Sequence, residues 1–145
     1  MRDVTLVSGP PGSGKTSYVT AHAHEGDLIV DLDTIWTALS GQPIYDKPTN
    51  LFPYVIAARD AVLDLLSNGP NEVRAWVIAT EPEAGKRREI QCHIRATSVI
   101  VLALNAEECI KRINADPRRD DMATWWKSIY KWWNCFSPNE GDIVQ

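Results

Sequence analysis

The sequence predicts an α/β fold with a mainly parallel β-sheet, in which residues 1–145 form a single domain. Apolar runs with the length and composition of buried strands alternate with segments whose apolar residues recur every three or four positions, as in helices. Directly after the first apolar run, residues 9–16 match the pattern G-x-x-x-x-G-K-[S/T] at every fixed position. A glycine-rich turn between a strand and a helix is typical of α/β proteins that bind phosphate groups.

The first strand is expected at residues 4–7, and a helix is expected to continue from residue 14 to residue 23. The glycines between them let the backbone bend so that successive N–H groups point at phosphate oxygens, and the helix adds the positive end of its dipole. Lys15 is expected to reach the β- and γ-phosphates of a nucleoside triphosphate, and the Thr16 hydroxyl to bind Mg²⁺. The residues expected to bind the nucleotide are Gly9, Pro11, Gly12, Ser13, Gly14, Lys15, Thr16 and Ser17.

The second strand is expected at residues 27–31, and an amphipathic helix follows with Asp33 or Thr34 near its N-cap. Residues 42–50 are rich in proline and polar side chains, which predicts an exposed loop. A longer helix is expected over residues 51–66, because apolar residues recur there at helical spacing.

The second half of the chain continues the alternation of strands and helices. The fourth apolar run is apolar almost throughout, as expected of a central parallel strand. Strands are expected at residues 73–79 and 98–104, with a short one at 142–144, and helices at residues 86–95, 105–113 and 122–136.

Acidic side chains follow the second strand, at the edge where functional residues of an open α/β sheet gather. Asp33 is our candidate general base, because a carboxylate facing the γ-phosphate can orient an acceptor hydroxyl and take its proton. The alternative role for Asp33 is that of a helix N-cap. Asp31 is the candidate for holding Mg²⁺ through water, and the sequence does not separate the roles of the two residues.

The third strand ends at Thr80 and Glu81, without the aspartate that organises Mg²⁺ in many NTPases. Either of these two side chains can replace that aspartate, or the site can rely on Thr16 and Asp31. The absence of a strong Walker B acid argues against a motor-type ATPase and favours the smaller kinases.

Basic residues are concentrated in residues 111–119, here called the lid segment. Guanidinium groups on a segment that closes over a nucleotide would neutralise charge on a transferring phosphoryl group. Arg112, Arg118 and Arg119 are therefore candidate catalytic residues alongside Lys15 and Asp33. The alternative is a solvated basic face near the C-terminal end of a helix.

The last expected helix carries two aromatic stripes. The first consists of Met122, Trp125, Ile129, Trp132 and Phe136, and the second of Trp126, Tyr130 and Trp133. The first is expected to pack on the domain core. The second is open to three uses: stacking of a nucleobase, binding of a partner, or formation of a homo-oligomer.

The composition narrows the classes of partner. The net charge is −4, which argues against a broad nucleic-acid-coating surface but leaves room for a small basic pocket. Three widely spaced cysteines predict structural thiols rather than a zinc site or a disulfide framework. No apolar run approaches the length of a membrane span and no signal peptide precedes the first strand, so we expect no membrane partner and a cytoplasmic location.

Several motifs occur in an order that is typical of one group of enzymes. They are residues 9–16, Asp33 before a helix, Lys86-Arg87-Arg88, residues 108–114 with the lid segment, and residues 126–131. In these motifs the chain resembles the P-loop kinase superfamily, and within it the 5′-kinase domain of phage-type polynucleotide kinases. The resemblance implies a three-layer P-loop NTPase fold with strand order 2-3-1-4 plus an edge strand, and a helical lid. It also implies ATP-dependent transfer of phosphate to a hydroxyl, with Asp33 as base and a lid arginine near the phosphates.

The chain departs from the polynucleotide kinase pattern on the acceptor side. The family has an arginine beside the catalytic aspartate and another three residues on, where this chain has Leu32 and Trp36. A pocket floored by Trp36 would suit a nucleoside, a nucleotide, a modified base in DNA or another small hydroxyl compound.

The sequence therefore predicts a kinase that uses Mg·ATP and acts on a hydroxyl acceptor, most simply the 5′-hydroxyl of a polynucleotide or a related nucleic-acid or nucleoside hydroxyl. If the chain comes from a phage, the expected location is the host cytoplasm. Two alternatives stand beside this prediction: a kinase for small molecules such as nucleosides and nucleotides, and a nucleotide-binding or nucleotide-hydrolysing module without kinase activity.

Overall fold

The computed structural model describes residues 1–145 and places them around one five-stranded sheet with the strand order β2-β3-β1-β4-β5. The strands are β1 (Arg2–Ser8), β2 (Leu28–Val30), β3 (Val73–Ile78), β4 (Ser98–Val101) and β5 (Ile143–Val144). Every pair of neighbouring strands is parallel. The predicted α/β class, parallel sheet and strand order with an edge strand are confirmed.

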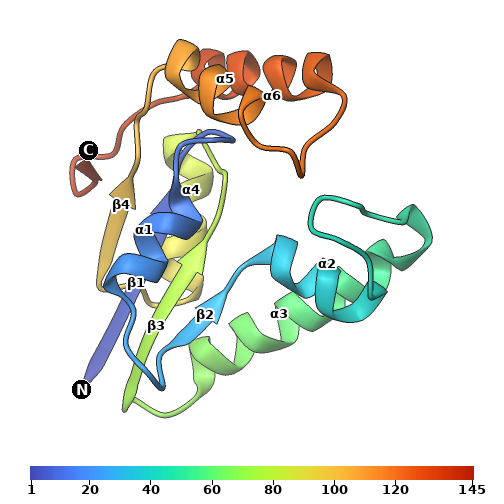
Figure 1. Cartoon of the computed structure of the whole chain (residues 1–145). Helices are drawn as coiled ribbons and strands as arrows, with labels where there is room; N and C mark the ends of the chain where they lie inside the picture. Colours follow the sequence, from blue (N-terminus) through green and yellow to red (C-terminus); the bar gives the residue numbers. More distant parts are fainter.

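The helices cover both faces and the carboxyl edge of this sheet. They are α1 (Lys15–His22), α2 (Leu32–Ser40), α3 (Phe52–Asn68), α4 (Ala84–His93), α5 (Ala106–Asn114) and α6 (Met122–Cys135), with a short 3₁₀ turn, η1 (Thr49–Leu51). Helix α1 lies on one face and α4 on the other, α2 and α3 lie beside β2, and α5 and α6 lie together across the carboxyl ends of the strands (Figure 1). None of the helices combines the length and hydropathy that crossing a membrane requires.

Side chains of β1 alternate between two hydrophobic clusters, as the two-residue period of a strand requires. Val4 and Leu6 belong to the larger cluster, which α3, α4 and α6 cover. Val7 faces the opposite side, where it packs with Val19 of α1 and Trp76 of β3. Because β1 is buried on both faces at the centre of the sheet, the loop that follows it starts from a rigid support.

The aromatic stripes of α6 divide largely as predicted. Ile129 and Trp132 are buried in the domain, and Trp132 stacks on Phe136 with ring centroids 4.9 Å apart. Phe136 follows the helix as its C-cap rather than ending it as its last residue. In the second stripe, Trp126 and Tyr130 are exposed by 40% and 51%, and the indole N–H of Trp126 donates to Oδ1 of Asn114 at 3.2 Å.

The C-terminal segment is fixed to helix α4 by a buried ion pair. Arg87 of α4 is fully buried and donates to Asp142 at 2.6 Å and to the backbone carbonyl of Ser137 at 2.6 Å. It also donates to the carbonyls of Glu81 and Pro82 at 3.2 and 2.7 Å. Within the basic cluster at residues 86–88, Arg87 is thus a structural link and Lys86 pairs with Glu83 on the surface, and none of the three residues lines the cavity described below.

Several element boundaries differ from the predictions by a few residues. Helix α4 begins at Ala84, ahead of the expected start, and β4 ends at Val101 rather than at residue 104. The ladder between β1 and β4 ends at Ser8 and Val101, because β1 itself gives way there to the glycine-rich loop. Apolar composition continues past that point, so it does not reveal where pairing stops.

Candidate active site

The glycine-rich loop joins β1 to α1, and the close approach of α5 explains two of its glycines. Gly12 and Gly14 have positive φ angles of 77° and 90°, which favour glycine. A Cβ on Gly12 would lie 2.9 Å from the Cys109 carbonyl oxygen and 2.9 Å from Cγ1 of Ile113, and one on Gly14 would lie 2.9 Å from Nη1 of Arg112. Helix α1 then begins directly at Lys15, so its N-terminal N–H groups face the cavity described below.

Lys15 is held inside the loop. Its Nζ donates to the carbonyl oxygens of Gly9 and Pro10, each at 2.9 Å. Burial lowers the pKa of this ammonium to about 8, although Asp33 nearby acts in the opposite direction. Lys15 is therefore a buried cation held by two carbonyl oxygens, positioned to exchange these partners for phosphate oxygens.

Asp31 and Thr16 lie together at the carboxyl end of β2. The Thr16 hydroxyl donates to Oδ2 of Asp31 at 3.4 Å, and the backbone N–H of Asp33 donates to Oδ1 at 3.1 Å. Asp31, not Asp33 or Thr34, is thus the N-cap of α2, which corrects the expected cap. Burial, followed by the charge of Asp33, raises the pKa of Asp31, so these surroundings disfavour the charged form of its carboxyl group.

This pair of oxygens fits Mg²⁺ as a partial ligand set. The chain contains no group of three His, Cys, Asp or Glu side chains able to hold a metal by themselves. Mg²⁺ in phosphoryl-transfer sites takes one or two protein oxygens and completes its shell with phosphate oxygens and water. A hydroxyl and a carboxylate in contact match that requirement, and the raised pKa of Asp31 would be relieved by a cation.

Asp33 lies in the first turn of α2, and its side chain does not cap the helix. Its carboxylate forms an ion pair with Nζ of Lys47 at 2.6 Å, and the two side chains are 35% and 36% exposed. Asp31 satisfies the helix end by itself, so the side chain of Asp33 is available to the cavity. The sequence left open which of the two acids has which role. In the structure, Asp31 contacts Thr16 and Asp33 contacts Lys47 instead.

The end of β3 supplies a hydroxyl rather than an acid. Thr80 lines the cavity, whereas the side chain of Glu81 turns back and accepts a hydrogen bond from the N–H of Glu83 at 3.1 Å. Of the two candidates for replacing a third-strand aspartate, only Thr80 is in place to do so.

These elements enclose one cavity of about 340 Å³ at the carboxyl edge of the sheet. Most of the predicted site residues line it: Pro11, Gly12, Gly14, Lys15, Thr16, Ser17, Asp31, Asp33, Arg112, Arg118 and Arg119. Gly9 and Ser13 do not, since they lie underneath, where a Cβ on Gly9 would be 2.6 Å from the Ser13 hydroxyl oxygen. The Ser13 hydroxyl is buried without a hydrogen-bond partner.

The three lid arginines have different surroundings. Arg112 reaches from α5 over the loop, with Nη1 3.4 Å from the Ser13 carbonyl oxygen. Arg118 is largely exposed, and Asp116 holds it through two hydrogen bonds of 2.9 Å each. These contacts lower the pKa of Asp116 to about 2, chiefly through the side-chain hydrogen bond from Arg118.

Arg119 is held between two aromatic rings. Its guanidinium carbon lies 4.2 Å from the ring centroid of Tyr45 and 4.2 Å from that of Trp125. Its Nη2 donates to the Tyr45 hydroxyl at 2.9 Å, while Nη1 is buried without a partner. Arg119 is therefore fixed in orientation and retains a donor that nothing in the chain satisfies.

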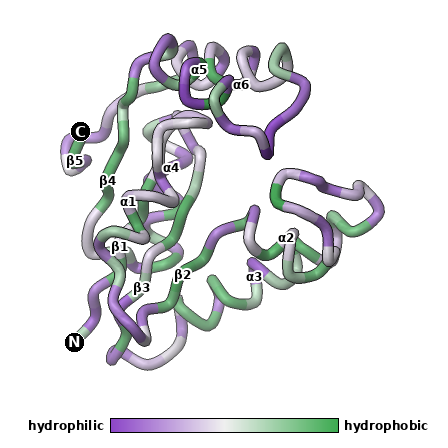
Figure 2. The backbone as a smooth tube through the Cα atoms, viewed as in Figure 1, coloured by the Kyte–Doolittle hydropathy of each residue, from purple (hydrophilic) through white to green (hydrophobic).

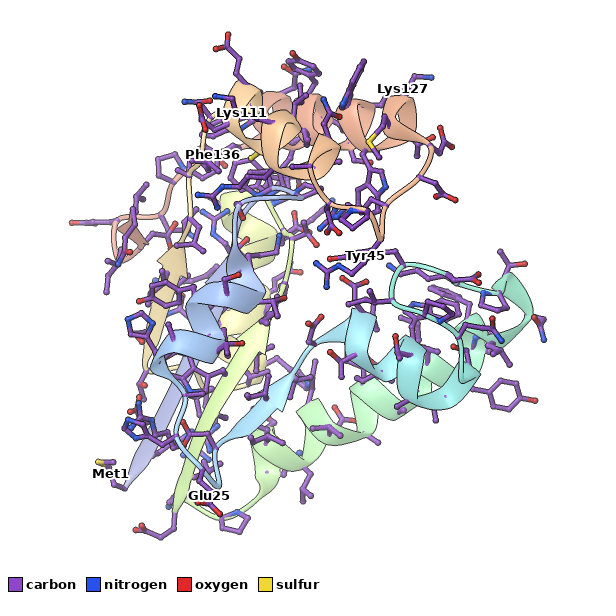
Figure 3. All side chains as sticks on the ribbon, in the orientation of Figure 1. Met1, Glu25, Tyr45, Lys111, Lys127 and Phe136 are labelled. Carbon is purple, nitrogen blue, oxygen red and sulfur yellow. The ribbon has the colours of Figure 1, made fainter.

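Tyr45 connects the two sides of the cavity. It lies on the loop of residues 41–48, here called the 41–48 loop, and faces the turn between α5 and α6 (Figure 3). That turn is hydrophilic along its length (Figure 2). The lid segment is thus in contact with the opposite wall of the cavity.

Sequence reasoning missed Tyr45, Lys47 and Asp116. The 41–48 loop was expected only to be exposed, and nothing in its composition shows that it folds back toward Asp33. Asp116 has no role of its own in the sequence-based predictions. Its position two and three residues before Arg118 and Arg119 is a signal that could have indicated an ion pair.

The predicted floor of the acceptor pocket was wrong. Trp36 is buried between α2 and α3, with its ring 6.3 Å from that of Phe52, and does not line the cavity. Leu32 and Trp36 lie one turn apart on the same face of α2. Only Leu32, at the start of the helix, lines the cavity, because Trp36 lies one turn farther along the helix.

Comparison with known proteins supports the fold. No model of a protein family matches the chain, and no curated protein matches it in sequence. Among solved structures, it is similar to a sugar kinase from Janibacter sp. HTCC2649, with a TM-score of 0.64, 19% identity, and coverage of 100% of this chain and 85% of that chain. A shikimate kinase from Bacteroides thetaiotaomicron has a TM-score of 0.63 and 14% identity, with coverage of 97% of this chain and 85% of that chain. A gluconokinase from Sinorhizobium meliloti 1021 has a TM-score of 0.61 and 13% identity, with coverage of 99% of this chain and 83% of that chain.

These likenesses show that the chain has the fold of P-loop kinases. They do not confirm the narrower resemblance to phage-type polynucleotide kinases, since none of the three is described as such an enzyme.

Proposed function

We propose that this protein is a small-molecule kinase that transfers the γ-phosphoryl group of ATP to a hydroxyl group. One observation carries the proposal: a carboxylate, Asp33, lines the same cavity as Lys15 and Thr16 of the phosphate-binding loop. A nucleoside triphosphate held by the loop would present its last phosphate toward that carboxylate. A kinase needs this juxtaposition, whereas a protein that only binds nucleotide does not.

The proposed chemistry is an in-line displacement. Asp33 accepts the proton of the acceptor hydroxyl, whose oxygen forms a bond to the γ-phosphorus while the bond from that phosphorus to the β–γ bridging oxygen breaks. ADP leaves with the electron pair of that bond. Lys15 and the N–H groups at the start of α1 stabilise the charge that develops on the bridging oxygen and the transferring group.

Thr16 and Asp31 would hold Mg²⁺, directly or through water. When bound, Mg²⁺ would offset the negative charge of the triphosphate oxygens. Among the lid arginines, the proposal assigns phosphate contact to Arg112 and Arg119, because one lies over the loop and the other has an unpartnered donor. Arg118 is assigned to holding Asp116.

A small acceptor suits this site better than a polynucleotide end. The chain carries a net charge of −4, which disfavours binding of a polyanion. The names of the similar solved structures refer to a sugar, to shikimate and to gluconate. The 5′-hydroxyl of a polynucleotide therefore becomes a competing acceptor to be tested, not the main proposal.

A nucleotide-binding module without kinase activity is the second candidate. The observation in its favour is the lack of an acid at the end of β3, where only Thr80 lines the cavity. Such a module would bind ATP and hydrolyse it slowly at most. A cytoplasmic location accompanies either proposal, because ATP is supplied there.

The test is incubation with labelled ATP, Mg²⁺ and a panel of acceptors: sugars, sugar acids, nucleosides, nucleotides and 5′-hydroxyl oligonucleotides. We expect label transfer to a small acceptor, with Asp33→Asn lowering kcat by about a thousandfold or more while ATP affinity stays unchanged. Asp46→Asn, an exposed acid on the same side of the molecule, is the matched control and should retain activity. Transfer to no acceptor with ATP binding intact would favour the binding module instead.

A further inference from the structure

The cavity has a basic residue that the proposed chemistry does not use. Lys47 lines the cavity and lies 2.6 Å from the carboxylate of Asp33, on the side where the acceptor must bind. Asp33 is the one carboxylate within ion-pair distance of Lys47. The two side chains are about one-third exposed, so solvent weakens their attraction and the pair can be exchanged for other partners at little cost.

The position of Lys47 is set by the path of its loop. Tyr45, two residues earlier, has a φ of 72°, which turns the chain back toward the cavity. Its ring and hydroxyl contact Arg119 of the lid segment, so the loop is fastened at both α2 and the lid. The backbone that carries Lys47 is therefore anchored, and this anchoring holds the Lys47 side chain beside Asp33.

The other cations of the cavity already have partners that the proposed chemistry explains. Lys15 and Arg112 contact the phosphate-binding loop, and Arg118 and Arg119 contact Asp116. When an acceptor hydroxyl takes the place beside Asp33, Lys47 loses part of its partner's charge and faces the acceptor instead. A hydroxyl that donates to Oδ1 of Asp33 lies within about 6 Å of the Lys47 ammonium, given the 2.6 Å ion pair to the same oxygen.

We propose that Lys47 forms an anion-binding subsite beside Asp33, so that the acceptor is a hydroxyl compound carrying a carboxylate or phosphate group a few bonds from the reacting hydroxyl. This inference rests on the proposed kinase function and names the class of its acceptor. A carboxylate or phosphate oxygen at that distance would accept a charge-assisted hydrogen bond from Lys47. The same contact would release Asp33 from its ion pair and leave it free to accept the hydroxyl proton.

The test compares acceptors in pairs, in which one member carries the anionic group and the other is a closely related neutral compound. Suitable pairs are gluconate with glucitol, shikimate with its methyl ester, glycerol 3-phosphate with glycerol, and a nucleoside monophosphate with its nucleoside. We expect kcat/KM for the charged member of at least one pair to exceed that of the neutral member by about 10- to 100-fold. The carboxylate and phosphate pairs distinguish the two sources of negative charge.

Substitutions then attribute the preference to Lys47. Lys47→Met, which keeps the length and removes the charge, should raise KM for the charged acceptor by about 10- to 100-fold and leave KM for ATP unchanged. Lys47→Arg should restore most of the preference, because it restores the charge. Lys127→Met, at an exposed lysine of α6 with no ion pair, is the control and should behave as wild type.

Three outcomes would overturn the inference while leaving kinase activity established. They are equal use of charged and neutral acceptors, an unchanged KM in Lys47→Met, and faster phosphorylation of neutral acceptors by Lys47→Met. The last would mean that Lys47 only obstructs Asp33. If no acceptor is phosphorylated, calorimetric titration with the same charged compounds still decides the point, since binding lost in Lys47→Met supports the subsite and binding unchanged by it refutes the subsite.

Discussion

Lys15 makes the residue-scale link between burial and function. Its pKa of about 8 lies well below the value of 10.5 for a free lysine, and burial is the main cause. Below pH 8 the side chain carries the charge that a triphosphate requires. As the pH rises through 8, the free protein loses this charge, and nucleotide binding must then be coupled to uptake of a proton.

We therefore expect ATP affinity to be nearly constant from pH 7 to 8 and to fall above about pH 8 by up to tenfold per pH unit. Equilibrium titration with a fluorescent ATP analogue from pH 7 to 9.5 measures this. Lys15→Arg keeps its charge over the whole range, so its weaker affinity should show no such decline. A flat wild-type curve would contradict the lowered pKa.

The residues closest to the phosphates could be predicted from sequence, and those on the acceptor side could not. Lys15 and Thr16 follow a strand in a pattern with fixed geometry, and Asp31 and Asp33 follow another, so the parallel sheet brings all four to one edge. Lys47 comes from a loop whose path depends on the contact between Tyr45 and Arg119, which lie 74 positions apart. No local pattern encodes such a contact.

At the scale of elements, the packing of α5 against the phosphate-binding loop explains why that loop tolerates only glycine at one position. Gly12→Ala would combine an unfavourable φ with contacts of 2.9 Å to Cys109 and Ile113. We expect a loss of about 2–5 kcal/mol in the free energy of unfolding, measured by denaturant titration, together with weaker ATP binding.

Gly26→Ala is the matched control for that substitution. Gly26 has a φ of 91°, but no atom lies within 4 Å of the place that a Cβ would occupy, so only the backbone term applies. The expected cost is about 1 kcal/mol. Equal costs for the two variants would show that α5 yields to the added methyl group.

The contact between the 41–48 loop and the lid segment gives a second prediction at this scale. Tyr45→Ala removes one of the two rings around Arg119, so the arginine should lose its fixed orientation. We expect kcat to fall by about 3- to 30-fold, and by less in Tyr45→Phe, which keeps the ring. Tyr54→Ala, at a tyrosine of α3 that is 69% exposed, should leave kcat unchanged. Full activity in Tyr45→Ala would exclude a role for this contact.

Whether a segment forms a strand or a helix could be predicted, because the two have different hydrophobic periods. Where each element ends depends on the elements that pack or pair with it. The strand at residues 98–101 stops where β1 stops pairing with it, although apolar residues continue. The N-cap of α2 is Asp31 and not Asp33, because the Asp31 carboxylate accepts a hydrogen bond from the backbone N–H of Asp33.

At the scale of the whole molecule, the buried pair between Arg87 and Asp142 joins the C-terminal segment to helix α4. Asp142→Ala would leave the Arg87 guanidinium buried without its carboxylate. We expect a loss of about 3–5 kcal/mol in the free energy of unfolding. Glu83→Ala, which removes the partner of exposed Lys86, should cost less than about 1 kcal/mol. Similar small losses in both variants would show that water replaces Asp142.

The exposed aromatic side chains of α6 keep the predicted homo-oligomer open as a proposal. Trp126 and Tyr130 together form an apolar surface next to Lys127 and Lys131. Analytical ultracentrifugation of the wild type and of Trp126→Ser would test whether copies of the chain associate through this surface.

The 55 positions between Arg87 and Asp142 also have a consequence for the order of folding. The carbonyls that Arg87 holds belong to the segment carrying Thr80 into the cavity. Docking of α4 before the Asp142 segment arrives would bury an arginine that has neither water nor a carboxylate. We therefore expect refolding molecules to acquire nucleotide affinity in one late step, when the Asp142 segment docks, rather than gradually.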